Sequence, residues 1–188
     1  MTPYNFVHLA LLAVGGEIYG RTKLQKTMYF LGILTKSLDD LGYRPHYYGP
    51  YSDAVAAGVN RLKALGFVQQ SSLHTGAMGD AGFEIARHDF KLTEEGERIA
   101  KEKAALDQDA WRKLQEAVTR FKEAGDVDYM KMSVAAKTYF VLSEKGKPAS
   151  VAELIESARA LGWSPKHEEV LDSVKFLQDL GLASANPT

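Results

Sequence analysis

Cysteine is missing from this chain of 188 residues. A disulfide framework and thiolate metal sites are therefore excluded, and nothing in the composition argues for export. An excess of charge is missing as well, because 23 basic residues face 24 acidic ones and leave a net charge of −1. Non-specific attraction to DNA usually comes from a basic footprint. The balance argues against strong attraction of that kind, but it leaves room for a locally basic face.

Long apolar runs are scarce too. The longest early run, FVHLALLAV at residues 6–14, has nine residues, whereas a membrane-spanning helix needs about 20. No basic side chain precedes it, so we expect no signal peptide. The content of 45% hydrophobic and 25% charged residues is ordinary for a soluble domain. We expect a cytoplasmic protein that contacts no membrane.

Signatures of catalysis and metal binding are also absent. The five histidines form no H-x-x-x-H pair, so the chain lacks a zinc helix. It has no G-x-S-x-G elbow, no cysteine nucleophile and no dinucleotide fingerprint. We therefore expect a protein that is not an enzyme and needs no metal and no cofactor. His8 lies in the first apolar run, where we expect a core histidine with satisfied hydrogen bonds.

What the chain does contain is a regular succession of helix signals. Residues 6–14 predict a first buried helix, and Thr22 is a suitable cap for a second helix over residues 23–36. A third helix is predicted over residues 53–66, where apolar residues recur at helical spacing up to a terminal glycine. Ser52 is a suitable cap for that helix.

Strand signals follow the third helix. FVQQSSL at residues 67–73 and FEIARHDFKL at residues 83–92 predict a β-hairpin, with GAMGDAG at residues 76–82 as a flexible wing tip. Thr93 then caps a further helix, which we expect to be interrupted at residues 107–109. Three helices and a hairpin in this order predict a winged helix-turn-helix.

The second half of the chain repeats the first in outline. VNRLKALGFV at residues 59–68 and VKFLQDLGLA at residues 174–183 share V-x-x-L-x-x-L-G followed by two apolar residues. The alternative is a chance likeness of two amphipathic helices that end in glycine. The repeat predicts a mainly α (α+β) fold: a winged-helix domain at 1–93, connecting helices at 94–125 and a second, smaller helix-turn-helix-like unit at 126–188.

An apolar stripe lies in the connecting region. It consists of Trp111, Leu114, Val118 and Phe121. One interpretation is a homodimer that forms through this stripe. The other is that the stripe packs between the two halves of its own chain, which is favoured because the second half needs something to hold it.

The stretch HYYGPYSDAV at residues 46–55 gathers tyrosines around a Gly-Pro turn. In an extended run, Tyr47 and Tyr48 would alternate, one facing the core and one the surface. The alternative is a partner-binding patch of Arg44, Tyr47, Tyr48 and Tyr51, because tyrosine and arginine are enriched in interfaces.

Basic residues at the start of the second helix could bind phosphates, or they could form a solvated face. The third helix would read bases, with Ser52 among its candidates. However, its first half is nearly bare of side chains and Asp53 would repel phosphate, which suits packing against protein at least as well. The expected nucleic-acid contacts are Arg21, Lys23, Lys26, Asn60, Arg61, Lys63, His74 and Arg87.

Four motifs, GRTKLQKTMYFL, YYGPYSDAV, RLKALGFV and FKLTEEG, together resemble the YwgA-like family of prokaryotic proteins. More distantly, they are similar to the SocA-like (Panacea) antitoxin domain, in which a K-L-Q-K-rich helix precedes a Gly-Pro turn. The ending, from SVAAKTYFVL to DLGLAS, looks like the second half of YwgA-like proteins. The resemblance implies a winged-helix fold, and the SocA-like domain implies neutralisation of a toxin by protein contact.

Two functions are therefore expected. The first is a DNA-binding regulator of transcription that positions itself with the basic residues, while the wing reaches an adjacent groove. The alternative is a protein-binding module, antitoxin-like or part of a defence system, that docks a partner such as a toxin through the tyrosines. A third possibility is an adaptor that only assembles larger complexes.

Overall fold

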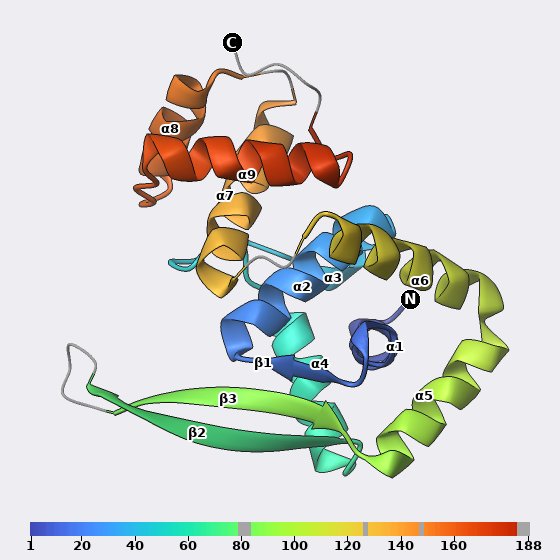
Figure 1. The fold of residues 1–188 in the computed structure, drawn as a ribbon. Coiled ribbons are helices and arrows are strands. Elements are labelled where there is room, and N and C mark those ends of the chain that lie inside the picture. Colours follow the sequence, from blue (N-terminus) through green and yellow to red (C-terminus); the bar gives the residue numbers. More distant parts are fainter. Residues whose placement is uncertain (79–83, 126–127, 147–148, 184–188) are drawn as a thin grey trace.

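The computed structural model describes residues 1–78, 84–125, 128–146 and 149–183, with backbone only for residues 74–78 and 84–85 (Figure 1). It is mainly helical with one antiparallel sheet of three strands, so the predicted α+β class is confirmed at that level. None of the helices in these ranges is long and apolar enough to cross a membrane.

The first half holds four helices and the sheet. Its elements are α1 (Pro3–Val14), β1 (Glu17–Tyr19), α2 (Arg21–Leu34), α3 (Leu38–Leu41), α4 (Asp53–Ala64), β2 (Val68–Met78) and β3 (Glu84–Leu92). Ser52 caps α4 as expected, since its hydroxyl accepts a hydrogen bond of 2.9 Å from the Val55 amide. The cap predicted for the second helix is wrong, because Gly20 is the N-cap of α2 and Thr22 lies inside the helix.

The sheet has the order β1-β3-β2. β1 is too short for an alternating pattern to show in the sequence, and it forms only because it pairs with β3, where Ile18 lies opposite Phe90. β2 extends to Met78, so residues 76–78 belong to a strand and not to the predicted wing tip. The rest of that tip, residues 79–82, lies outside the described residues.

The second half is helical throughout its described residues. Its elements are α5 (Glu94–Leu106), α6 (Gln108–Glu123), α7 (Tyr129–Lys145), α8 (Val151–Ala160) and α9 (His167–Asp179). Thr93 caps α5 and Asp107 caps α6, where the break was expected. The repeated motif covers the C-terminal parts of α4 and α9. A glycine in the left-handed conformation follows each helix: Gly66 has a φ of 74° and Gly181 has a φ of 67°.

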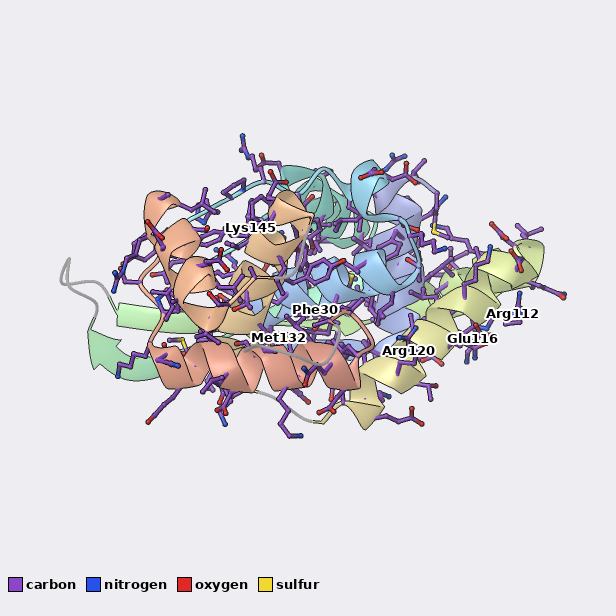
Figure 2. The ribbon with its side chains drawn as sticks, turned by 90° about the horizontal axis from the view of Figure 1, so that it is seen from above. Phe30, Arg112, Glu116, Arg120, Met132 and Lys145 are labelled. Atoms are coloured by element: carbon purple, nitrogen blue, oxygen red, sulfur yellow. The ribbon has the colours of Figure 1, made fainter. Side chains whose placement is uncertain are left out.

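Three apolar clusters hold these elements together. The first lies among α1, α2, α4, the sheet and α6, and the third lies among α7, α8 and α9. The second cluster joins the two halves, because it draws side chains from α2, α7 and α9. Phe30 of α2 and Met132 of α7 both belong to it and lie close together in Figure 2.

The predicted dimer stripe is part of this interior. Leu114 and Val118 are buried in the first cluster, at 1% and 4% exposure. Phe121 lies 6.0 Å from the Phe30 ring and 6.2 Å from the Phe176 ring. The homodimer interpretation is therefore wrong, because the stripe already packs between the two halves of its own chain.

His8 is fully buried in α1, as expected for a core histidine. Its Nε2 lies 2.8 Å from the Gly96 carbonyl and its Nδ1 lies 3.2 Å from the Lys103 ammonium. These partners assign a neutral ring that donates from Nε2 and accepts at Nδ1. Burial lowers the pKa of His8 from 6.5 to about 4.

This shift predicts a loss of stability in mild acid. Between pH 6.5 and pH 4, His8 is protonated in the unfolded state but stays neutral in the folded state. The free energy of unfolding therefore decreases as the pH is lowered through this range. From pH 7 to pH 5 the loss from this group is about 2 kcal/mol. His8→Gln, whose neutral amide still donates to Gly96, should show a smaller drop in urea unfolding. An equal drop in both proteins would contradict the assignment.

Candidate functional site

The loop between α3 and α4, residues 42–52, forms a small hairpin that we call the tyrosine loop. Arg44 and Tyr51 exchange two backbone hydrogen bonds, of 3.0 and 2.9 Å. At the tip, the Gly49 amide donates to the His46 carbonyl over 2.9 Å, which closes a β-turn. Gly49 has a φ of 93°, so this position of the turn needs glycine.

Tyr47 and Tyr48 occupy the two corner positions of this turn. They are 72% and 60% exposed, and their rings meet edge to face with centroids 4.9 Å apart. The expectation that one of them faces the core is wrong, because a turn does not alternate its side chains as an extended run does. Both rings therefore point to solvent as a pair.

Two donors from the second half of the chain hold the backbone of the turn. The Trp163 indole donates to the His46 carbonyl over 2.8 Å, and the Ser133 hydroxyl donates to the Tyr48 carbonyl over 2.6 Å. Trp163 is 2% exposed and Ser133 is 6% exposed, so both donors are fixed by their surroundings.

Two donors from α2 hold the other end of the loop. The Lys26 ammonium donates to the Pro50 carbonyl over 2.6 Å, and the Gln25 amide binds both backbone groups of Ser52, over 3.0 and 3.1 Å. Lys26 is 2% exposed and Ser52 is fully buried. The prediction of Ser52 as a base reader is therefore wrong, because the loop folds over it, and Lys26 lies beneath the loop instead of on an open surface of α2.

A second pair of exposed side chains starts α7. Tyr129 and Met130 are 54% and 58% exposed. They precede Ser133 by four and three residues, so they lie on the face of α7 that reaches the tyrosine loop. The name tyrosine patch is used below for Tyr47, Tyr48, Tyr129 and Met130. The sequence analysis did not single out the α7 pair, whose helix reaches the tyrosine loop through Ser133.

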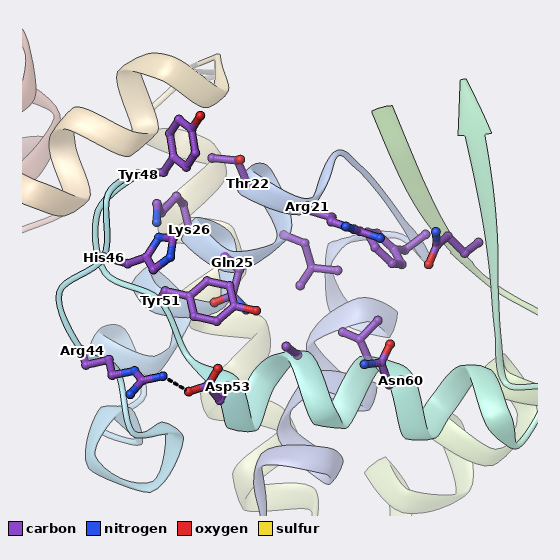
Figure 3. A pocket seen from close by; sticks show the side chains of 15 residues that line it. Arg21, Thr22, Gln25, Lys26, Arg44, His46, Tyr48, Tyr51, Asp53 and Asn60 are labelled. Atoms are coloured by element: carbon purple, nitrogen blue, oxygen red, sulfur yellow. Dashed lines mark hydrogen bonds and ion pairs between the residues drawn. The ribbon is translucent and has the colours of Figure 1, made fainter. Parts of the chain in front are cut away.

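Below the loop lies a hollow of about 650 Å³, between the start of α2 and α4 (Figure 3). It unites members of both predicted sets. Its lining includes Arg21, Lys26 and Asn60 of the expected DNA contacts and Arg44, Tyr48 and Tyr51 of the expected partner contacts. The floor is the face of α4 that carries Asp53, Ala56 and Asn60.

Cations dominate the charge of this hollow. Arg44 forms an ion pair with Asp53, the acidic residue of the lining, and both side chains are exposed. Lys26 forms no ion pair with the described residues. Its pKa is lowered from 10.5 to about 8, mainly by burial and also by the nearby Lys137 ammonium. An anion in the hollow would oppose the repulsion by Lys137 and raise the pKa of Lys26.

The other expected DNA contacts on α4 have partners within the chain. The Arg61 guanidinium lies 4.7 Å from the centre of the Tyr4 ring, and the Lys63 ammonium donates to Gln70 over 2.5 Å. Asn60 is exposed. Both cations keep their charge, but these contacts orient their side chains toward other parts of the chain.

The remaining expected DNA contacts differ in their surroundings. Arg87 forms a two-pronged ion pair with Asp89 and lies over the Tyr19 ring. Lys23 on α2 is half-buried. The side chain of His74 lies outside the described residues. Arg21 and Asn60 are therefore the exposed members of the expected set that line the hollow.

No protein-family model matches the chain, and no curated protein matches it either. The resemblance to YwgA-like and SocA-like proteins therefore stays a prediction. Function has to be argued from the geometry of the tyrosine patch and the hollow.

Proposed function

We propose that the chain is a protein-docking module whose partner binds the tyrosine patch. One observation carries the proposal: two tyrosines point to solvent from the turn of a loop whose backbone is held by donors on α2, α7 and the segment after α8. Such a turn is already ordered, so binding loses little conformational entropy. An antitoxin-like role, with a toxin as partner, is the form of this proposal that the SocA-like resemblance favours.

The composition of the patch supports this proposal. Tyrosine and methionine are enriched where proteins meet, and rigid aromatic rings supply much of the binding energy there. Tyr47 and Tyr48 contribute little to folding, since neither packs into an apolar cluster. Their exposure leaves apolar ring surface that a partner would cover.

The Tyr47→Ala, Tyr48→Ala double variant tests the proposal. Affinity capture from the source organism should identify a partner, whose binding to purified protein is then measured by calorimetry. We expect the double variant to weaken binding about 30-fold or more, the loss typical of an interface hot spot. Its free energy of unfolding should stay within about 0.5 kcal/mol of the unmodified protein.

Leu106→Ala is the matched control. Leu106 is 88% exposed at the end of α5, across the molecule from the tyrosine loop (Figure 1). This variant also removes an exposed apolar side chain, but it should leave the binding constant unchanged. Full binding by the double tyrosine variant would remove the patch as the docking surface.

A second candidate function is DNA binding by a winged-helix fold. It is favoured by the order α1-β1-α2-α3-α4-β2-β3, in which α4 would lie in the major groove. Arg21 and Asn60 would then face the DNA. The internal partners of Arg61, Lys63 and Arg87 count against it. Binding of a random DNA duplex, measured over a series of salt concentrations, tests this candidate. Each phosphate contact adds about −0.9 to the slope of log binding constant against log salt concentration.

A further inference from the structure

The end of the hollow beside the tyrosine loop contains a buried cation. The Lys26 ammonium touches the Pro50 carbonyl, and no carboxylate of the described residues pairs with it. Figure 3 shows Lys26 between Tyr48 and His46, in the wall of the hollow. A buried charge is costly unless an opposite charge accompanies it. A ligand anion would supply that missing charge.

The first turn of α2 adds a second attraction for anions at the same end. Its N-cap is Gly20, which offers no side-chain acceptor to the amides of the turn. Such a helix end carries a partial positive charge and unpaired N–H groups, and it is a common phosphate site. Thr22 in this turn lines the hollow and precedes Lys26 by one helical turn. The helix end and the ammonium thus face the same space.

Repulsion from the floor is small. Asp53 at the start of α4 forms an ion pair with Arg44, so its negative charge is already paired with a positive one. Arg21, the first residue of α2, adds a further positive charge to the lining, and the exposed Asn60 amide lies farther along α4 (Figure 3). The lining therefore suits a dianion better than a neutral molecule.

We infer that this hollow binds a phosphate-bearing small molecule of nucleotide size, with its phosphate between the first turn of α2 and the Lys26 ammonium. The volume of about 650 Å³ lies within the range of small-molecule sites. The remainder of the ligand would lie along α4 toward Asn60, beside the Tyr51 and His46 rings, whose centres are 5.2 Å apart. This site goes beyond the proposed function, since its ligand is not a protein and needs no docked partner.

Calorimetric titration tests the inference with inorganic phosphate and adenosine monophosphate as probes. Adenosine, which lacks the phosphate, is the matched ligand control and should bind at least tenfold more weakly than the monophosphate. Lys26→Met removes the ammonium and keeps a long apolar side chain, so we expect at least tenfold weaker binding of both phosphate probes. Lys175→Met removes the charge of an exposed lysine on α9 that does not line the hollow, and it should bind as the unmodified protein does.

A second variant keeps the test decisive if Lys26→Met fails to fold. Asn60→Asp changes an exposed side chain by one charge and should weaken binding of the monophosphate several-fold. Absence of binding by both phosphate probes would overturn the inference, as would equal binding by the Lys26 and Lys175 variants. Binding of a random duplex that depends on Lys26, without binding of the monophosphate, would assign the site to DNA instead. Tyr48 lies in both the patch and the lining of the hollow. The substitutions in this test leave all four residues of the tyrosine patch unchanged, so failure here leaves the docking proposal standing.

Discussion

Gly96→Ala is expected to lower the free energy of unfolding by about 3 kcal/mol or more, the upper range for overpacking. A Cβ atom at this position would lie 2.0 Å from the Phe67 carbonyl oxygen and 2.8 Å from its carbon. Both are backbone atoms, and that carbonyl also accepts a 3.0 Å hydrogen bond from the Thr93 amide. The Gly96 carbonyl is itself bound to buried His8. The backbone at Phe67 and the backbone at Gly96 therefore cannot move apart without weakening these two hydrogen bonds.

Gly58→Ala is the matched control. This glycine also lies in a helix, but an added Cβ would meet the nearest atoms of Tyr4 and Val7 at 3.4 Å, an ordinary van der Waals contact. Alanine also favours the helix by up to about 1 kcal/mol. Urea unfolding followed by circular dichroism should place this variant within about 1 kcal/mol of the unmodified protein. Similar stability of the two alanine variants would show that α5 does not approach Phe67 so closely.

Trp163→Ala is the second large effect that we expect, with a loss of about 3–5 kcal/mol from the part of the chain that Trp163 stabilises. The side chain is 2% exposed and lies edge to face on Phe140, with ring centres 6.0 Å apart. Its indole N–H also holds the His46 carbonyl. Trp163→Phe keeps most of the packing but removes this donor, so it should cost less in stability, about 1–3 kcal/mol.

The tyrosine loop should report the lost donor directly. We expect chymotrypsin to cleave after Tyr47 or Tyr48 faster in both Trp163 variants than in the unmodified protein, because the turn is no longer held. Val141→Ala is the control, since Val141 is buried in the same third cluster and has no hydrogen bond to the loop. If it sensitises the loop as much as Trp163→Phe does, general destabilisation explains the cleavage and the indole contact does not hold the turn.

The candidate site was only half visible in the sequence. Tyrosine and arginine enrichment pointed to the loop on which the docking proposal rests. The sequence did not show which side chains of this loop and its neighbours face the solvent and which face the interior. Lys26 looks like a surface lysine on an amphipathic helix until Pro50, 24 residues later, folds over it. Tyr129 and Met130 lie within four residues of Ser133, whose hydrogen bond to the Tyr48 carbonyl spans 85 residues.

Local features of the fold were determined by the sequence itself. Ser52, Thr93 and Asp107 cap their helices through hydrogen bonds that span three residues, so the neighbouring residues are enough to predict them. The tertiary structure alone decided that β1 exists, that the Trp111 to Phe121 stripe is interior, and that both Tyr47 and Tyr48 face solvent. Each of these depends on a partner distant in the chain, such as β3 for β1 and Trp163 for His46. Contacts of that kind form only when the two halves pack together, and no periodicity in the sequence encodes them.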